Sequence, residues 1–177
     1  VGNKAIDDAD LVDALKAGTL SFEGYNGNTY TIGSDVYVYY FGAGSDGAMK
    51  IGNQNVDVDG DTYAFSFGKT GSNKGRGLSE ADDVLYVNGL KADSDMRYQA
   101  FKNGTAVEDP TTIIDDQNAY LVNTSGSIMK NKKNLKDTDD GYYCTDSKGH
   151  VTGYSETKCG TKKDDGTVYT CSNPKHK

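Results

Sequence analysis

The apolar residues along the chain predict one helix followed by many short strands. In residues 6–17, IDDADLVDALKA, the side chains of Ile6, Leu11 and Leu15 recur at the spacing of one helix face. Aspartates at the start of this stretch interact favourably with the positive end of a helix dipole, and Gly18 marks its expected end. Beyond the helix, runs rich in Tyr, Val and Thr alternate with turn residues, which is typical of β-hairpins.

The predicted strands are short and end at turns that contain Gly, Asn or Asp. These residues tolerate the positive φ that tight hairpins require. Residues 78–87 can also contain a short helical turn. The predicted strands are 29–32, 36–41, 62–67, 84–87, 119–122, 142–145 and 168–171, and the predicted turns are Tyr25-Asn-Gly-Asn, Asp59-Gly60, Asn88-Gly89, Asn103-Gly104 and Asp140-Gly141.

Three segments share one order of residue types, which indicates an internal repeat. They are residues 39–52 (YYFGAGSDGAMKIG), 120–131 (YLVNTSGSIMKN) and 142–153 (YYCTDSKGHVTG). Each starts with an aromatic residue in an apolar run, passes through a turn of small and polar residues, and reaches another apolar residue. A unit this short cannot bury its own apolar face, so neighbouring units are expected to stack.

The pattern therefore predicts an all-β fold made of stacked β-hairpin repeats, solenoid-like, with a short N-terminal helix. We expect three parts along the sequence. Residues 1–34 hold the helix and a lead-in strand, residues 35–154 hold the repeats, and residues 155–177 form a polar tail.

The composition fits short β-strands and narrows the range of partners. The chain has 13 Tyr and 22 Gly but no Trp, and 26 Asp and Glu stand against 19 Lys and Arg. Nucleic-acid binders need a basic face, so the acidic balance argues against a nucleic-acid partner. No stretch approaches the roughly 20 apolar residues that a membrane-spanning helix requires, so we expect no transmembrane segment.

Catalytic and metal-binding patterns find little support in the sequence. The only histidines are His150 and His176, and neither sits in a recognisable catalytic context. Residues 55–61, NVDVDGD, place oxygen-bearing side chains as an EF-hand loop does, but position twelve is Ser66 and no helices flank the loop. A hairpin turn explains the same residues. We therefore predict no catalytic residues, no metal site and no cofactor.

The region around the first repeat resembles the cell-wall-binding repeats of Gram-positive surface proteins, which include choline-binding and glucan-binding repeats. Tyr39-Tyr40-Phe41 looks like the Y-Y-F of that family, and residues 46–52 (DGAMKIG) look like its D-G-x-M-x-x-G segment. Residues 59–65 look like the entry to the next hairpin. The likeness covers about 35–154 and implies a hairpin solenoid, a secreted and cell-wall-associated protein, and binding without catalysis.

The resemblance also implies that ligands bind to aromatic side chains of adjacent hairpins. In the choline-binding branch such side chains hold a quaternary ammonium by cation–π attraction, which is strongest for Trp. Since Trp is absent here, a stacked sugar is the better expectation. Each aromatic residue can alternatively serve the core. The candidate ligand-binding residues are Tyr39, Tyr40, Tyr63, Phe65, Tyr86, Tyr120, Tyr142, Tyr143 and Tyr154.

The three cysteines, Cys144, Cys159 and Cys171, lack the closely spaced pairs of common zinc sites. In an exported protein, one disulfide and one free thiol are expected, and three pairings are possible. In the resemblance Cys144 takes the place of the repeat's Phe, which would turn it toward the core. The preferred pairing is therefore Cys159–Cys171, although both of these cysteines can equally be reduced.

These observations predict a non-catalytic module that binds cell-wall polysaccharide or another glycan by aromatic stacking. The module would belong to a secreted or surface protein of a Gram-positive bacterium, and it can be part of a longer chain. The alternative is a degenerate structural stalk or protein-interaction module that lost its ligand sites together with the Trp residues.

Overall fold

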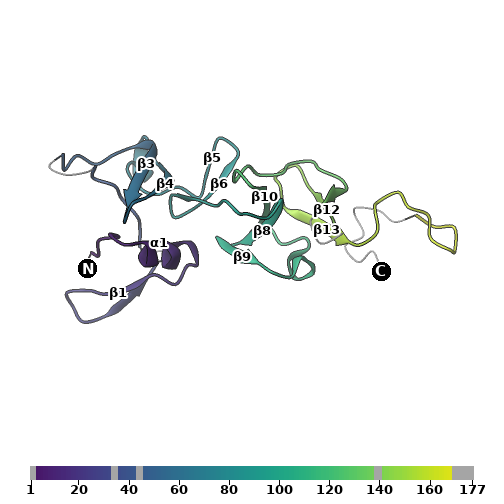
Figure 1. The fold of residues 1–177 in the computed structure, drawn as a ribbon, viewed down its shortest axis with the longest axis horizontal. Helices are drawn as coiled ribbons and strands as arrows, with labels where there is room; N and C mark the ends of the chain where they lie inside the picture. The colour runs from purple at the N-terminus through teal and green to yellow at the C-terminus, as the bar shows by residue number, and fades with distance from the viewer. Residues whose placement is uncertain (1–2, 33–35, 43–45, 138–140, 169–177) are drawn as a thin grey trace. The chain divides into compact units, whose positions relative to one another are not determined.

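The structure, a computed structural model, consists in its described residues mainly of strands and turns with one α-helix (Figure 1). The chain forms two compact units, Val1–Ala92 and Asp93–Lys177, and the division falls inside the predicted repeat region. The predicted all-β class is confirmed at this level. The residues that the structure describes are 3–32, 36–42, 46–137 and 141–168.

Helix α1, Ala9–Lys16, confirms the helix predicted near the N-terminus. It begins after Asp8, whose carboxylate accepts a hydrogen bond from the Leu11 N–H at 2.9 Å and so satisfies an otherwise unpaired donor. It ends before Gly18, which adopts a φ of 71°. Among the described residues no helix is long and apolar enough to cross a bilayer.

The first unit contains a two-stranded hairpin and a five-stranded antiparallel sheet. The hairpin pairs β1, Ser21–Glu23, with β2, Thr29–Thr31. The sheet has the strand order β3-β4-β7-β6-β5, and its longest pairing joins β3 to β4 over seven residue pairs. The strands of this sheet are β3, Gly52–Val58; β4, Asp61–Phe67; β5, Glu80–Ala81; β6, Val84–Val87; and β7, Leu90–Lys91, with the 3-10 helix η1, Gly71–Asn73, between β4 and β5.

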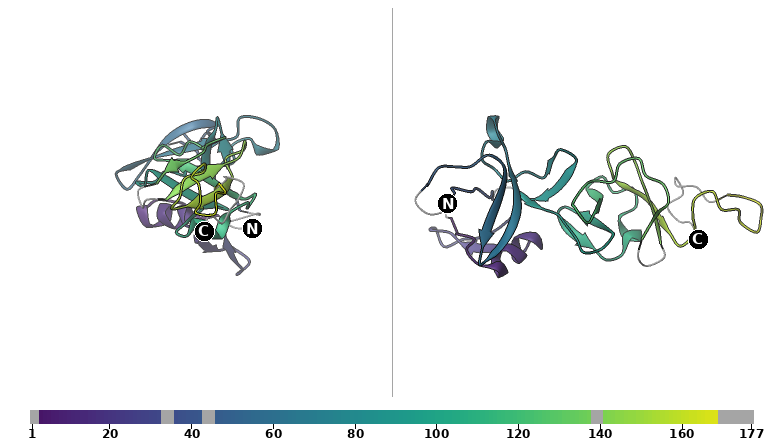
Figure 2. Two further views of the ribbon diagram at one scale, coloured as in Figure 1. Left: turned by 90° about the vertical axis from the view of Figure 1, so that its right-hand side faces the viewer. Right: turned by 45° about the horizontal axis from the view of Figure 1, so that its top comes forward.

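The core of the first unit forms where α1 packs against β3 and β4 (Figure 2). The buried face of α1 contributes Val12 and Leu15, which are about 1% exposed or less. The β4 side chains Phe65 and Phe67 stack with ring centroids 5.7 Å apart. The buried members of this cluster are Val12, Leu15, Leu20, Val58, Phe65, Phe67 and Leu90.

The hairpin turns have the conformation that their sequences predict. In Asp59-Gly60, Asn88-Gly89 and Asn103-Gly104 both residues have positive φ, as a two-residue type I′ turn requires. Asp82-Asp83 does the same between β5 and β6. Residues 78–87 therefore form a hairpin and not a helical turn. The predicted Asp140-Gly141 turn includes Asp140, which lies outside the described residues.

The second unit contains two three-stranded antiparallel sheets, ordered β10-β8-β9 and β11-β12-β13. They are bridged between Tyr120 and His150, and a buried cluster lies among their strands. The elements are β8, Tyr98–Lys102; β9, Thr105–Val107; the 3-10 helix η2, Pro110–Ile113; β10, Ala119–Asn123; β11, Leu135–Lys136; β12, Tyr142–Thr145; and β13, Val151–Ser155. The buried cluster contains Ala100, Ile113, Ala119, Leu121, Tyr143 and Val151.

Two structural predictions need correction. No hairpin solenoid is detected in the described residues, because the strands form separate, open sheets. The predicted strand at 36–41 belongs to no sheet. Val36 forms an isolated β-bridge, and the Val38 and Tyr40 carbonyls accept single hydrogen bonds from the Gly77 and Lys50 N–H groups. The predicted strand at 168–171 lies outside the described residues except for Val168, which bridges to Lys162.

Candidate functional site

Most of the aromatic residues predicted to bind ligand lie in or against the two cores. Tyr39 is exposed, with 39% of its surface accessible, whereas the other eight are buried or half-buried. Tyr40 and Tyr63 pack against the core of the first unit, and Tyr154 packs against that of the second. The structure therefore does not bring the nine residues together in one site.

An exposed row of aromatic side chains surrounds Tyr39. Tyr37, Tyr39 and Phe41 are 45%, 39% and 52% exposed, while the intervening Val38 and Tyr40 pack against the core of the first unit. This alternation indicates an extended backbone that presents every second side chain to solvent. The rings of Tyr39 and Phe41 lie 6.5 Å apart. We refer to Tyr37, Tyr39 and Phe41 as the aromatic stripe.

A pocket lies at one end of the aromatic stripe, and the cationic side chain of Arg76 in this pocket lies beside two rings of the stripe. The Arg76 guanidinium lies 4.1 Å from the centre of the Tyr37 ring, and its Nε donates a hydrogen bond to the Tyr39 hydroxyl at 3.3 Å. The pocket thus offers aromatic, cationic and hydrogen-bonding groups together. It is lined by Tyr37, Asn73, Arg76, Gly77, Leu78, Ser79 and Asn88, and we call it the Arg76 pocket.

The loop that carries Arg76 is held by backbone contacts with β4 and with the turn that follows β6. The Arg76 carbonyl accepts a hydrogen bond from the Gly68 N–H at 2.8 Å, and the Leu78 N–H donates to the Ser66 carbonyl at 3.0 Å. At Gly77 a Cβ atom would lie only 2.1 Å from the Asn88 carbonyl oxygen, so this close approach needs glycine. The backbone around Arg76 is therefore fixed in place.

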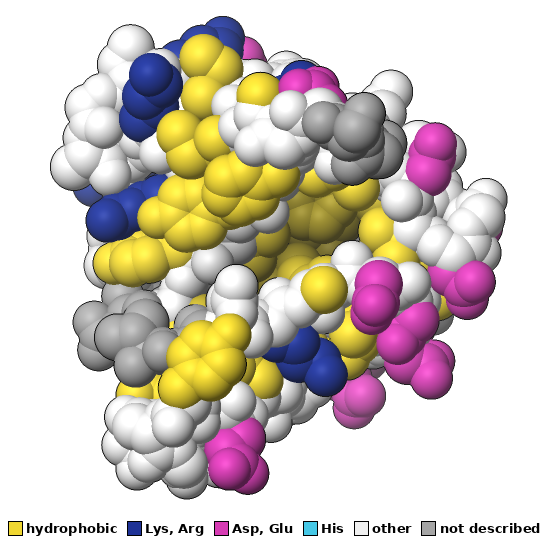
Figure 3. Space-filling view, turned by 90° about the vertical axis from the view of Figure 1, so that its left-hand side faces the viewer, with side chains coloured by type: hydrophobic (Ala, Val, Ile, Leu, Met, Phe, Trp, Pro, Cys, Tyr) yellow, Lys and Arg dark blue, Asp and Glu magenta, His cyan; other side chains and the backbone are white. Residues whose placement is uncertain are grey.

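Figure 3 shows a band of hydrophobic side chains that is hollowed at its centre. In this view most Lys and Arg side chains lie at the upper left and most Asp and Glu side chains lie at the right, with a further Lys or Arg side chain below the hollow. Besides the aromatic stripe, the first unit exposes Met49 and Ile51, which are 38% and 40% accessible. Nearby, Lys50 is paired with Asp46. Exposed apolar surface of this kind is typical of binding sites.

The sequence prediction found Tyr39 but missed Tyr37, Phe41 and Arg76. The signal for the two missed aromatics was present in the predicted strand at 36–41, because side chains two residues apart share one face. Arg76 carried no such signal. It lies 37 residues from Tyr39 in the sequence, and only the folded loop brings it to the aromatic stripe.

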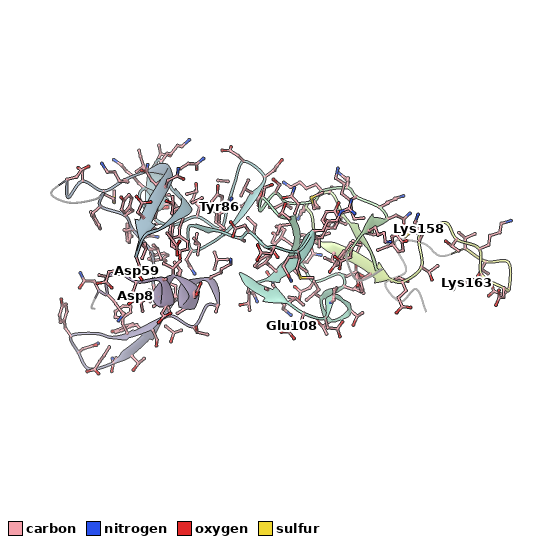
Figure 4. All side chains as sticks on the ribbon, in the orientation of Figure 1. Asp8, Asp59, Tyr86, Glu108, Lys158 and Lys163 are labelled. Atoms are coloured by element: carbon pink, nitrogen blue, oxygen red, sulfur yellow. The ribbon has the colours of Figure 1, made fainter. Side chains whose placement is uncertain are left out.

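The other predicted aromatics have structural neighbours. Tyr86, on β6 (Figure 4), is 8% exposed, and burial raises the pKa of its phenol. The Lys158 ammonium lies 5.4 Å from the Tyr142 ring, a cation–π contact in the second unit. Tyr143 and Tyr154 contact each other with centroids 4.6 Å apart. Each of these rings therefore packs against a neighbouring part of the protein. This structural role explains the presence of each ring without a ligand.

A second polar cluster in the second unit joins Asp146 to His150. One Asp146 oxygen accepts hydrogen bonds from the N–H groups of Lys148, Gly149 and His150 at 2.8–2.9 Å, and the other lies 2.9 Å from the His150 Nδ1. Burial raises the pKa of Asp146, but these hydrogen bonds outweigh it and hold the pKa below its usual value. The His150 ring is buried and contacts Tyr120 at 4.8 Å.

The calcium-like segment 55–61 lies in the β3–β4 hairpin. Asp59 sits in the turn, and Asp57 accepts a hydrogen bond from the Thr62 hydroxyl at 2.6 Å. The part of the chain that the structure describes holds no group of three or more His, Cys, Asp or Glu side chains suited to a metal ion. The hairpin turn therefore accounts for these residues.

The cysteine pairing differs from the preferred prediction. The Sγ atoms of Cys144 and Cys159 lie 3.2 Å apart, which juxtaposes the two residues as disulfide partners. Asn134 holds Cys159 in place by accepting from its N–H at 2.7 Å and donating to its carbonyl at 3.1 Å. Cys144 is buried as predicted, and its core-facing side chain reaches Cys159. Cys171 lies outside the described residues.

Comparisons with known proteins do not assign the chain to a family. No protein-family model matches it, and neither the curated proteins nor the solved structures gave a match. The functional argument therefore depends on the geometry of the aromatic stripe and the Arg76 pocket.

Proposed function

We propose that this chain is a non-catalytic glycan-binding module in which sugar rings stack on the aromatic stripe. The observation that carries the proposal is the exposure of Tyr37, Tyr39 and Phe41 on one side of an extended segment whose other side is anchored in the core. Three exposed rings in a row are costly to leave in water and provide no core packing. A ligand that covers them explains their placement.

The geometry suits an extended saccharide chain. Residues two apart in an extended segment are separated by about 6.5–7 Å along the backbone, and the Tyr39 and Phe41 rings are 6.5 Å apart. Neighbouring sugars of a polysaccharide can therefore each find a ring. In the Arg76 pocket, Asn73, Ser79 and Asn88 offer hydrogen-bonding groups for sugar hydroxyls.

A binding role without catalysis also agrees with the placement of one adjacent carboxylate pair. Asp82 and Asp83 form the turn between β5 and β6, where both are exposed and have positive φ. A glycosidase needs two carboxylates that face each other across the scissile bond, roughly 5–9.5 Å apart. We extend the proposal to the setting that the repeat resemblance implies, a secreted and cell-wall-associated protein of a Gram-positive bacterium.

The test is co-sedimentation of the purified chain with Gram-positive cell walls and with insoluble glucans. The variant Tyr37→Ala/Tyr39→Ala/Phe41→Ala should bind at least about tenfold more weakly. Each lost stacking contact is worth about 0.5–1.5 kcal/mol, and 1.4 kcal/mol corresponds to a factor of ten. The fold should persist, because Val38 and Tyr40 still anchor the segment.

The matched control is Tyr25→Ala. Tyr25 is 88% exposed and lies outside the aromatic stripe, in the turn between β1 and β2, so its loss should leave binding unchanged. Equal binding by the triple variant and the wild type would rule out the aromatic stripe as the site. If the wild type binds neither walls nor glucans, the structural or protein-interaction role becomes the better account, since eight of the nine predicted aromatics are buried or half-buried.

A further inference from the structure

We propose that the Arg76 pocket recognises a sugar carboxylate, so that the module selects acidic glycans. This inference rests on the proposed function, since it names the ligand class of the same site. Arg76 is the one cationic residue among those that line the pocket. Arg76 stands between the Tyr37 ring and the Tyr39 hydroxyl, and both contacts orient its guanidinium.

The guanidinium retains donors for a ligand. Arginine carries five N–H donors, and the Tyr39 hydroxyl takes one of them, from Nε. Within the described part of the chain, no carboxylate forms an ion pair with Arg76, whereas Lys50 is paired with Asp46 and Lys102 with Asp116. A carboxylate matches the geometry of the remaining N–H donors, because it can accept two parallel hydrogen bonds.

The positive charge of Arg76 contrasts with the net charge of the chain. The protein carries a net charge of −7, which on average repels anions. Arg76, however, is a positive group that lies beside the rings of Tyr37 and Tyr39. This local positive charge beside stacking rings favours a ligand with both an apolar ring face and a negative group.

The same geometry argues against a cationic ligand. A quaternary ammonium binds to the face of an aromatic ring, but the guanidinium already lies over the Tyr37 ring at 4.1 Å. Another positive charge there would be repelled. The sugar ring is therefore expected on Tyr39 and Phe41, with its carboxylate directed to Arg76 and its hydroxyls near Asn73 and Asn88.

The experiment compares acids with their uncharged esters by calorimetric titration of the whole chain. The probes are trigalacturonic acid and its methyl ester, and the N-acetylglucosamine–N-acetylmuramic acid disaccharide and its methyl ester. The two pairs of probes distinguish a uronic acid from a muramic acid as the sugar that carries the carboxylate. At least one acid should bind about tenfold or more tightly than its ester, and added salt should reduce this difference.

Three variants assign the effect to Arg76. Arg76→Gln should bind acid and ester equally. Arg76→Lys should keep part of the preference, because it retains the charge but loses the paired hydrogen bonds. Lys74→Gln is the matched control, since Lys74 is exposed, lies two residues away and changes the net charge equally. It should behave as the wild type. Circular dichroism of each variant checks that the fold is intact.

The possible failures can be told apart. If acid and ester bind equally and binding still needs the aromatic stripe, the carboxylate inference is wrong while the glycan-binding proposal holds. An acid preference that Arg76→Gln retains, or that Lys74→Gln also removes, overturns the role of Arg76. If neither these probes nor walls and glucans bind, both proposals fail.

Discussion

At the scale of single residues, Asp146 shows how one carboxylate can organise a loop. Its two oxygens satisfy three backbone N–H groups and the ring of the buried His150. Leaving the part-buried N–H groups of Gly149 and His150 without an acceptor would be costly, so the carboxylate allows His150 to sit in the interior beside Tyr120. The arrangement closes the turn between β12 and β13.

Asp146→Ala should therefore destabilise the protein by about 1–3 kcal/mol at neutral pH, the usual cost of leaving buried donors unpaired. Since the folded-state pKa of Asp146 is lowered, its stabilising contribution is complete above the unfolded value of about 3.9. That contribution is lost as the pH falls through the lower, folded-state pKa. Thermal unfolding at pH 7 and in steps below pH 4 should show the difference between variant and wild type shrinking.

Asp164→Ala provides the comparison for this measurement, because Asp164 is exposed. It should change the melting temperature little at either pH. A difference between Asp146→Ala and wild type that stays constant down to pH 2 would contradict the role given to the ionised carboxylate.

At the scale of elements, the two-residue turns determine how the hairpins form. Gly60 and Gly89 occupy the second position of equivalent turns, with φ of 90° and 96°. Their surroundings differ. A Cβ on Gly60 would meet nothing within 4 Å, whereas one on Gly89 would lie 2.7 Å from the Gly77 backbone. The Asp59-Gly60 turn needs glycine only for its backbone conformation. The Asn88-Gly89 turn needs glycine also because it packs closely against the Gly77 backbone.

Gly60→Ala should lower the free energy of unfolding by about 1–2 kcal/mol, the penalty of a left-handed conformation for a residue with a Cβ. Gly89→Ala should cost this amount and a further 1–3 kcal/mol, roughly, because the methyl group forces the neighbouring backbone to move. Urea unfolding of both variants gives the two free energies. Equal losses would show that the close approach of Gly89 to Gly77 does not hold in solution.

At the scale of the whole molecule, the chain has two units, each with its own core. The buried cluster of the first unit combines α1 with β3, β4 and β7, and that of the second lies among the strands β8, β10, β12 and β13. Only the second unit contains cysteines, and Cys144 and Cys159 are juxtaposed there. A change in this pair should therefore affect one unit selectively.

Reduction by a thiol reagent should destabilise the second unit by about 3 kcal/mol, the value expected for a closed loop of about 15 residues. Hydrogen exchange followed by mass spectrometry should then speed up in peptides from residues 93–168 and stay unchanged in residues 3–92. Cys171→Ser should behave as the wild type, whereas Cys159→Ser should resemble the reduced protein. If Cys171→Ser instead resembles the reduced protein, the disulfide joins Cys159 to Cys171, the pairing preferred from the sequence.

The sequence by itself determined the local structure of this protein. Helix α1, the turns at Asp59-Gly60 and Asn88-Gly89, and the strands β4, β6 and β12 follow from periodicity and turn chemistry, which act over a few neighbouring residues. These predictions are confirmed because local and tertiary preferences agree there.

Tertiary structure alone decided which side chains meet. The repeat pattern predicted stacking into a solenoid, but the strands pair into separate open sheets, since the repeating residue types do not specify the partner of each strand. Cys144 meets Cys159, and Arg76 meets Tyr37 and Tyr39, through contacts between distant parts of the sequence. The alternation of a strand shows which aromatic side chains share a face, but what packs against the strand decides which of its two faces is buried.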